Sequence, residues 1–176
     1  EYNLANLGYV IAHEFSHSLD VIGSKYDFNG NLKNWWSEED KKKYQKLVND
    51  VNAQYKKFMS YDKLHPNVEL YIGENIADIT GIALCNDYLM LYHSVKENLE
   101  SVSTTFLSLK TFYNYYAIQM RQHLTDDSMQ MLLKKDPHPP DKYRINCPLS
   151  RLELFNKIFG VTEKDRMYWN SKMDIW

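Results

Sequence analysis

The segment Val10-Ile11-Ala12-His13-Glu14-Phe15-Ser16-His17 places two histidines and a glutamate within one turn of a helical pattern. Apolar side chains recur at steps of three and four residues from Leu4 to Phe15, which is the period of an amphipathic helix. In such a helix His13 and His17 lie ~40° apart on one face and ~6 Å apart along the axis. Two imidazoles so placed can bind one zinc ion. The pattern therefore favours a helix that carries part of a metal site.

Glu14 follows the first histidine and would lie at the flank of the ligand face. From there a carboxylate can take a proton from a zinc-bound water as general base. The alternative is a helix that carries two surface histidines and a glutamate by chance. The apolar run of residues 9–12 favours a buried helix instead, because buried histidines need partners.

A catalytic zinc site needs a third protein ligand and one open position for water. The best candidate is Glu74 in the segment Gly73-Glu74-Asn75-Ile76-Ala77-Asp78, with Asp78 one helical turn later on the same face. Asp78 could accept a hydrogen bond from the other nitrogen of a ligand histidine and so fix its tautomer. On these two residues alone, a solvated acidic face or an N-terminal capping acid is the better interpretation.

A second group of polar residues lies in and just after the run Asp136-Pro137-His138-Pro139-Pro140. Because of its prolines, this run cannot form the interior of a helix. A rigid loop that presents His138, with Arg144 six residues later, could donate hydrogen bonds to a developing oxyanion and to a substrate carbonyl. On the residues alone, an ordinary polar surface loop is the better interpretation.

The rest of the pattern predicts a mainly α fold in one domain. A short hairpin or turn is expected over residues 26–32, which contain an Asn-Gly pair, and a loop over residues 60–70. Helices are expected over about residues 3–21, 37–59, 71–95, 104–123, 126–134 and 150–159.

Composition excludes several classes of function. The chain has 176 residues and a net charge of -2, so it builds no large basic surface and predicts no nucleic-acid partner. No apolar run approaches the ~18 residues of a membrane span, so no membrane segment is expected in this chain. Cys85 and Cys147 are too few for a disulfide scaffold and leave the redox compartment open. Because the chain opens at once into a helical pattern, we expect it to be the back half of a longer domain.

These blocks, in this order and spacing, resemble the C-terminal catalytic half of the neprilysin and endothelin-converting-enzyme family of zinc metalloendopeptidases. Residues 29–36 are similar to the family's segment just after the zinc helix, and Asp174-Ile175-Trp176 is similar to its tryptophan ending. The resemblance implies a gluzincin-type zinc peptidase fold. Residues 1–176 would be the C-terminal part of one catalytic domain, with the N-terminal part and the lid domain outside this chain.

The resemblance also implies a role for each matched position. One Zn²⁺ per chain would be bound by His13, His17 and Glu74, with Glu14 as the general base. His138 would stabilise the tetrahedral intermediate, and the further positions fall into two groups. Three acids would support the site: Asp20, Asp78 and Asp136. Of these, Asp78 would orient His13. The residues that would contact the substrate are Arg144, on a backbone carbonyl, and Val10 and Met120, which match positions around the family's apolar S1′ pocket.

Two departures from the family pattern affect what can be carried over. The Asn-Ala-x-Tyr type of segment that aligns the substrate lies upstream of the zinc helix in relatives and is not in this chain. Met173 stands where animal ectoenzymes have a cysteine, so the family's terminal disulfide is not expected. An extracytoplasmic location is implied by the resemblance alone.

Two functions of different classes follow. The first is a zinc-dependent endopeptidase that hydrolyses internal bonds of oligopeptides, and it is favoured because the polar positions of the matched set are intact. The second is a catalytically incompetent fragment or pseudo-peptidase that acts as a binding or assembly module, and the absence of the upstream half favours it. Expected partners are an oligopeptide substrate and the N-terminal part of the protein, in cis or as a separate chain.

Overall fold

The computed structural model describes residues 1–96 and 102–170, and this part of the chain is mainly α-helical, as predicted. The predicted resemblance at Asp174-Ile175-Trp176 and the departure at Met173 lie outside the described residues. Within the described ranges, no helix is both long and apolar enough to cross a membrane. In chain order the elements are η1 Leu4–Gly8, α1 Tyr9–Ser16, η2 His17–Leu19, η3 Gly23–Lys25, α2 Glu38–Ser60, η4 Val68–Leu70, α3 Ile72–Lys96, α4 Val102–Gln119, α5 Asp126–Lys135, α6 Asp141–Ser150 and α7 Glu153–Phe159.

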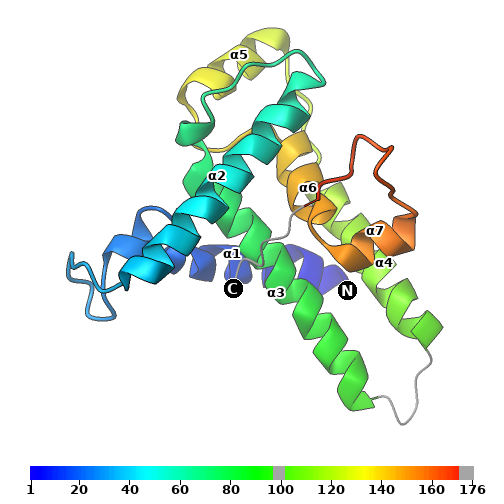
Figure 1. Ribbon diagram of the computed structural model, residues 1–176. Helices are drawn as coiled ribbons and strands as arrows, with labels where there is room; N and C mark the ends of the chain where they lie inside the picture. The colour runs from blue at the N-terminus through cyan, green and yellow to red at the C-terminus, as the bar shows by residue number, and fades with distance from the viewer. Residues whose placement is uncertain (97–101, 171–176) are drawn as a thin grey trace.

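The long helix α3 runs through the middle of the molecule and contacts α1, α2, α4 and α6 (Figure 1). Its apolar side chains enter two hydrophobic clusters. Ile76 and Ile79 pack with residues of α2 and α6, and Ile82 and Leu89 pack with residues of η1, α1, α4 and α7. A helix buried on several sides gives a stable platform for polar groups near its first turns.

The first predicted helix, over residues 3–21, is shorter and less regular than expected. It begins as the π-helical turn η1, continues as α1 and ends in the 3-10 turn η2. The helix ends because Asp20 is extended and its carboxylate accepts hydrogen bonds from the backbone N–H groups of Ile22 and Gly23 at 2.7 and 2.8 Å. Such a bond offers the backbone an alternative to the helix. A side chain at Gly23 would collide with the carbonyl of His17, so the turn needs glycine there.

The predicted hairpin or turn over residues 26–32 is a tight turn closed by an isolated antiparallel bridge between Tyr26 and Leu32. Asp27 accepts from the backbone N–H groups of Asn29 and Asn31, and Gly30 adopts a φ of 77°. Glycine occupies such left-handed positions without the steric cost that a Cβ brings.

The helices α2, α3, α4 and α5 confirm four of the predicted helices, with α4 ending earlier than expected. Ser37 caps α2 by accepting from the N–H of Asp40 at 3.1 Å. The last predicted helix begins at Glu153 rather than at Ser150 and ends at Phe159, followed by Gly160 in the left-handed conformation.

The helix α6 was not predicted, because the sequence interpretation expected no helix between residues 134 and 150. Pro148 lies in the last turn, where it removes one bond to the carbonyl of Arg144. That carbonyl accepts a hydrogen bond from the hydroxyl of Tyr116 at 2.7 Å instead. The tertiary contact thus replaces the bond that the proline removes, and the helix forms.

Candidate metal centre

The helices α1 and α3 pack closely at the point where the first histidine lies. Gly81 of α3 makes this approach possible, because a Cβ there would lie 3.0 Å from the backbone nitrogen of His13 and 3.1 Å from its Cα. The side chain of His13 is therefore held against α3, with only 8% of its surface exposed. The local helix and the tertiary packing together place this imidazole beside the first turns of α3.

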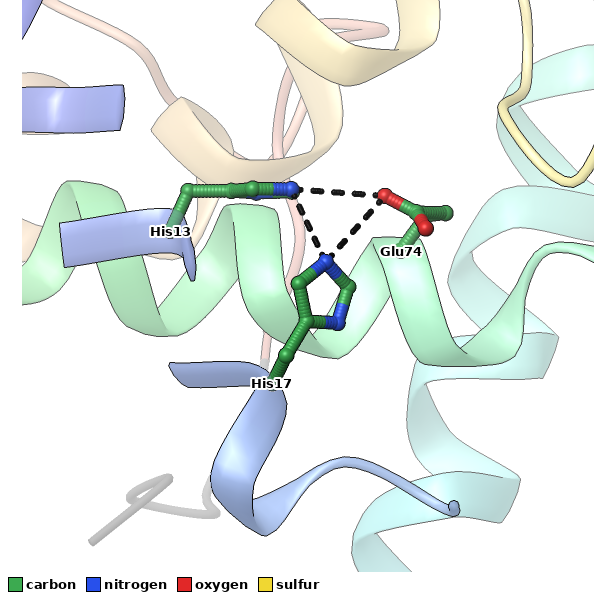
Figure 2. Close-up of side chains that lie close together, drawn as sticks. All are labelled: His13, His17 and Glu74. Atoms are coloured by element: carbon green, nitrogen blue, oxygen red, sulfur yellow. Dashed lines mark hydrogen bonds and ion pairs between the residues drawn. The ribbon is translucent and has the colours of Figure 1, made fainter. Parts of the chain in front are cut away.

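His13, His17 and Glu74 converge as the sequence predicts (Figure 2). The Nε2 atoms of the two histidines are 3.2 Å apart, and Oε2 of Glu74 lies 3.3 Å from the first and 3.6 Å from the second. Within the described ranges, these three side chains form a group whose ligand atoms all lie within 4.8 Å of one another. Although His17 lies just past the end of α1, its φ and ψ of -59° and -20° keep the helical spacing.

The second nitrogen of each histidine faces a carboxylate. Nδ1 of His17 lies 2.7 Å from Oδ2 of Asp20, and Nδ1 of His13 lies 2.9 Å from Oδ1 of Asp78. The contact of His13 is short but is not aligned as a straight hydrogen bond. Both acids favour a proton on Nδ1 and so leave the lone pair on Nε2, which is the form that a metal needs.

Asp78 is fully buried and is held by three side chains from two neighbouring helices. Arg144 of α6 donates from Nε to Oδ2 at 2.8 Å and from Nη2 to Oδ1 at 2.7 Å, and the hydroxyl of Tyr9 donates to Oδ1 at 2.5 Å. Burial raises the pKa of the Asp78 carboxyl, but the bonds from Arg144 and His13 outweigh it and hold the pKa at about 2. Asp78 is therefore a buried anion next to His13.

The donor set of the site fits a divalent cation. Oε2 of Glu74 is buried and accepts no hydrogen bond, although it faces the nitrogens of His13 and His17. Burial lowers the pKa of His13, but Asp78 and Glu74 raise it more, to about 9. Two imidazole nitrogens and one carboxylate oxygen are the ligands of a catalytic zinc site. The residues present therefore fit this ion.

The proline-rich loop brings His138 to the same place. Its Nε2 lies 3.1 Å from Oε2 of Glu74, and its Nδ1 lies 2.9 Å from Oδ1 of Asp136, which also accepts from the backbone N–H of His138 at 2.9 Å. The hydrogen bond from the His138 backbone N–H, together with the His138 ring, holds the pKa of the Asp136 carboxyl below its usual range, although partial burial opposes this. The residues alone suggested an ordinary surface loop, and the structure instead places His138 against the candidate ligands.

The other predicted site residues occupy different positions. Glu14 is exposed on α1, one residue after the first histidine, and Val10 is 45% exposed on the same helix. Met120 is half-buried just after α4, where it packs on the second hydrophobic cluster. Arg144, predicted to contact the substrate, is bound to Asp78 through two of its three nitrogens.

Tyr9 is a residue of the site that the sequence interpretation missed. It precedes His13 by four residues, so both side chains lie on one face of α1, and both reach Asp78. The signal available in the sequence was this spacing, which repeats the step from His13 to His17. Tyr9 belonged instead to an apolar run that we used only as a sign of burial.

The His-Glu-x-x-His helix packed on a second helix that bears a carboxylate defines a gluzincin type of metallopeptidase fold. The model of "Peptidase family M13" matches residues 1–175, and the chain belongs to this family, the family of neprilysin and the endothelin-converting enzymes. The resemblance inferred from the sequence is thereby confirmed.

Similar proteins come from insects and bacteria. The chain is 32% identical to an endothelin-converting enzyme homolog of Locusta migratoria. The match covers 99% of this chain and 24% of the Locusta protein. It is also 32% identical to a neutral endopeptidase of Lactococcus lactis, again over 99% of this chain and 26% of the relative. The chain thus spans about a quarter of the length of these relatives.

Solved structures show the same fold. The zinc metalloprotease Zmp1 of Mycobacterium tuberculosis, in complex with an inhibitor, superposes with a TM-score of 0.80 at 26% identity, over 96% of this chain and 26% of that one. PepO from Lactobacillus rhamnosis gives a TM-score of 0.78 at 28% identity, over 96% of this chain and 25% of that one.

Proposed function

We propose that this chain carries the catalytic residues of a zinc-dependent endopeptidase that hydrolyses internal bonds of oligopeptides. The observation that carries the proposal is the convergence of His13, His17 and Glu74, whose ligand atoms lie within 4.8 Å of one another. The names of the relatives, a neutral endopeptidase and a zinc metalloprotease among them, support the same chemistry.

His13, His17 and Glu74 would hold the ion through Nε2, Nε2 and the carboxylate. A bound zinc would lower the pKa of a water toward ~7 and polarise the scissile carbonyl. Asp78 and Asp20 favour the tautomer that presents Nε2, because the carboxylate of each lies within 2.9 Å of a histidine Nδ1. These two acids thereby fix the orientation of the ligands before any metal or substrate arrives.

Glu14 is placed to move the proton. It stands on α1 directly after the first ligand, and its exposed side chain can reach solvent and substrate. As general base it would take a proton from the attacking water and pass it to the leaving amine.

His138 and Arg144 would act on the substrate. Oδ1 of Asp136 lies 2.9 Å from Nδ1 of His138 and orients the ring. With a proton on each ring nitrogen, His138 would donate from Nε2 to a developing oxyanion. Arg144 uses Nε and Nη2 for Asp78, so Nη1 would contact a backbone carbonyl of the peptide. Val10 and Met120 stay proposed walls of an apolar side-chain pocket.

The rest of the protein would complete this site. Leu7, Ile11 and Phe15 of η1 and α1 are 66%, 60% and 72% exposed, and such apolar surface usually marks an interface. The chain also spans only about a quarter of its relatives. We therefore propose that the N-terminal part of the protein, in cis or as a separate chain, covers this face and supplies the missing substrate contacts.

The replacement Glu14→Gln tests the catalytic assignment, because it keeps the shape of the side chain and removes the base. We expect peptide hydrolysis to fall by ~10²–10⁴-fold while bound zinc is retained. The matched control is Glu163→Gln, a second exposed glutamate, which should hydrolyse peptides at the parental rate. Parental activity in Glu14→Gln would show that the general base is another residue.

A further inference from the structure

We propose that Tyr9 is a positioning residue of the metal centre, which acts through Asp78 to hold His13 in its ligating orientation. The inference rests on the proposed zinc site and adds a residue to it. Tyr9 is 2% exposed, and its hydroxyl donates to Oδ1 of Asp78 at 2.5 Å. The same oxygen lies 2.9 Å from Nδ1 of His13.

The hydrogen-bonding capacity of Asp78 explains why this hydroxyl matters. A carboxylate has about four acceptor sites. Arg144 fills one on each oxygen, Tyr9 fills the second on Oδ1, and Nδ1 of His13 lies 2.9 Å from the same oxygen. Since Asp78 is fully buried, no water takes the place of a lost donor at low cost. Each donor therefore determines where Oδ1 lies.

Tyr9 differs from Arg144 in the helix from which it acts. Arg144 holds Asp78 from α6, which does not carry a ligand histidine. Tyr9 lies on α1, one turn before His13, so it ties Oδ1 to the same helix as the ring that Oδ1 must meet. The distance between Oδ1 and Nδ1 of His13 is thus set within a single helical turn.

The ring of Tyr9 is itself fixed by its neighbours. It packs edge-on against the ring of Tyr116, with centroids 4.7 Å apart, and lies 5.9 Å from the ring of His13. The hydroxyl of Tyr116 donates to the carbonyl of Arg144 at 2.7 Å. Helices α1, α3, α4 and α6 therefore meet around Asp78, and the ring contacts of Tyr9 hold its hydroxyl toward that carboxylate.

The test compares Tyr9→Phe with Tyr113→Phe in the full-length protein. Tyr113 is 1% exposed and donates to Oδ1 of Asn86 on α3 at 2.5 Å, so it matches Tyr9 in burial, bond length and acceptor helix. Its acceptor, however, is an amide that does not contact a ligand histidine. Both variants lose one buried hydroxyl, and only Tyr9→Phe disturbs Asp78.

We expect the zinc dissociation constant, measured by competition with a chromophoric chelator, to rise ~10-fold in Tyr9→Phe. This is the lower end of the range for residues that support a metal ligand without binding the metal, because Arg144 keeps its two bonds to Asp78. Tyr113→Phe should bind zinc as the parent does, and both should show a comparable drop in Tm. The ¹⁵N resonances of His13 in the zinc-loaded protein should shift in Tyr9→Phe alone.

An unchanged or tighter dissociation constant in Tyr9→Phe, or an equal weakening in Tyr113→Phe, would overturn the positioning role and leave a purely structural hydroxyl. A parent protein that binds no zinc would overturn both this inference and the proposed function. The parent measurement therefore separates the failure of the metal site from the failure of the role of Tyr9.

Discussion

The replacement Gly81→Ala probes the packing on which the metal centre depends. A Cβ at this position would lie 3.0 Å from the backbone nitrogen of His13, 3.1 Å from its Cα and 3.4 Å from its Cβ. The first two neighbours are main-chain atoms, which cannot rotate out of the way as the tip of a side chain can. We therefore expect α1 to move away from α3 by a few tenths of an ångström.

The expected magnitudes follow from two opposing terms. Overpacking a tight core costs about 1–3 kcal/mol. The gain in helix propensity from glycine to alanine returns about 1 kcal/mol. The net loss of unfolding free energy should therefore be about 0–2 kcal/mol, which leaves the protein folded. Metal distances, however, hold within about 0.2 Å in a good site. A shift of His13 relative to Glu74 should thus weaken zinc binding by roughly tenfold, or about 1.4 kcal/mol.

Urea denaturation and chelator competition measure these two quantities separately. The control is Gly8→Ala, where the new Cβ would meet the flexible end of the Leu4 side chain rather than backbone. This variant should be at least as stable as the parent and bind zinc equally well. Parental or tighter zinc binding in Gly81→Ala, with folding intact, would refute the claim that the close approach of α1 and α3 sets the geometry of the ligands.

Two further replacements separate the supporting acid from the substrate-contacting histidine. In Asp20→Asn the amide oxygen stays with the N–H groups of Ile22 and Gly23, and the NH₂ group then faces Nδ1 of His17. Zinc affinity should fall ~10–100-fold by chelator competition, and parental affinity would exclude Asp20 from the support of His17. His138→Ala should lower kcat by ~10²–10³-fold in a peptidase assay, with KM and zinc content nearly unchanged. Loss of zinc in this variant would instead make His138 a ligand.

The sequence predicted the parts of the site that local spacing determines. His13 and His17 follow from one helical turn, and Asp78 follows from its place one turn after Glu74. The meeting of these two segments depends on tertiary packing, which the glycine at position 81 permits. The spacing of residues does not show that α1 and α3 pack together. The residues alone therefore left the assignment of Glu74 as third ligand open, and the family resemblance decided it.

The parts that the sequence did not predict depend on contacts between distant segments. Helix α6 forms although Pro148 removes one of its backbone hydrogen bonds, because the Tyr116 hydroxyl donates to the Arg144 carbonyl instead. The partnership of Arg144 with Asp78 joins α6 to α3 across a buried pair. His138 meets Glu74 because of the path of the loop before α6. None of these partners is marked by a local pattern.

Anomalous diffraction at the zinc absorption edge, on crystals of the full-length protein loaded with zinc, tests the central claim most directly. The claim predicts one strong peak per chain, about 2.0–2.2 Å from Nε2 of His13, Nε2 of His17 and the carboxylate of Glu74. A peak at other residues, or a zinc-loaded protein with no peak between these three side chains, would contradict it.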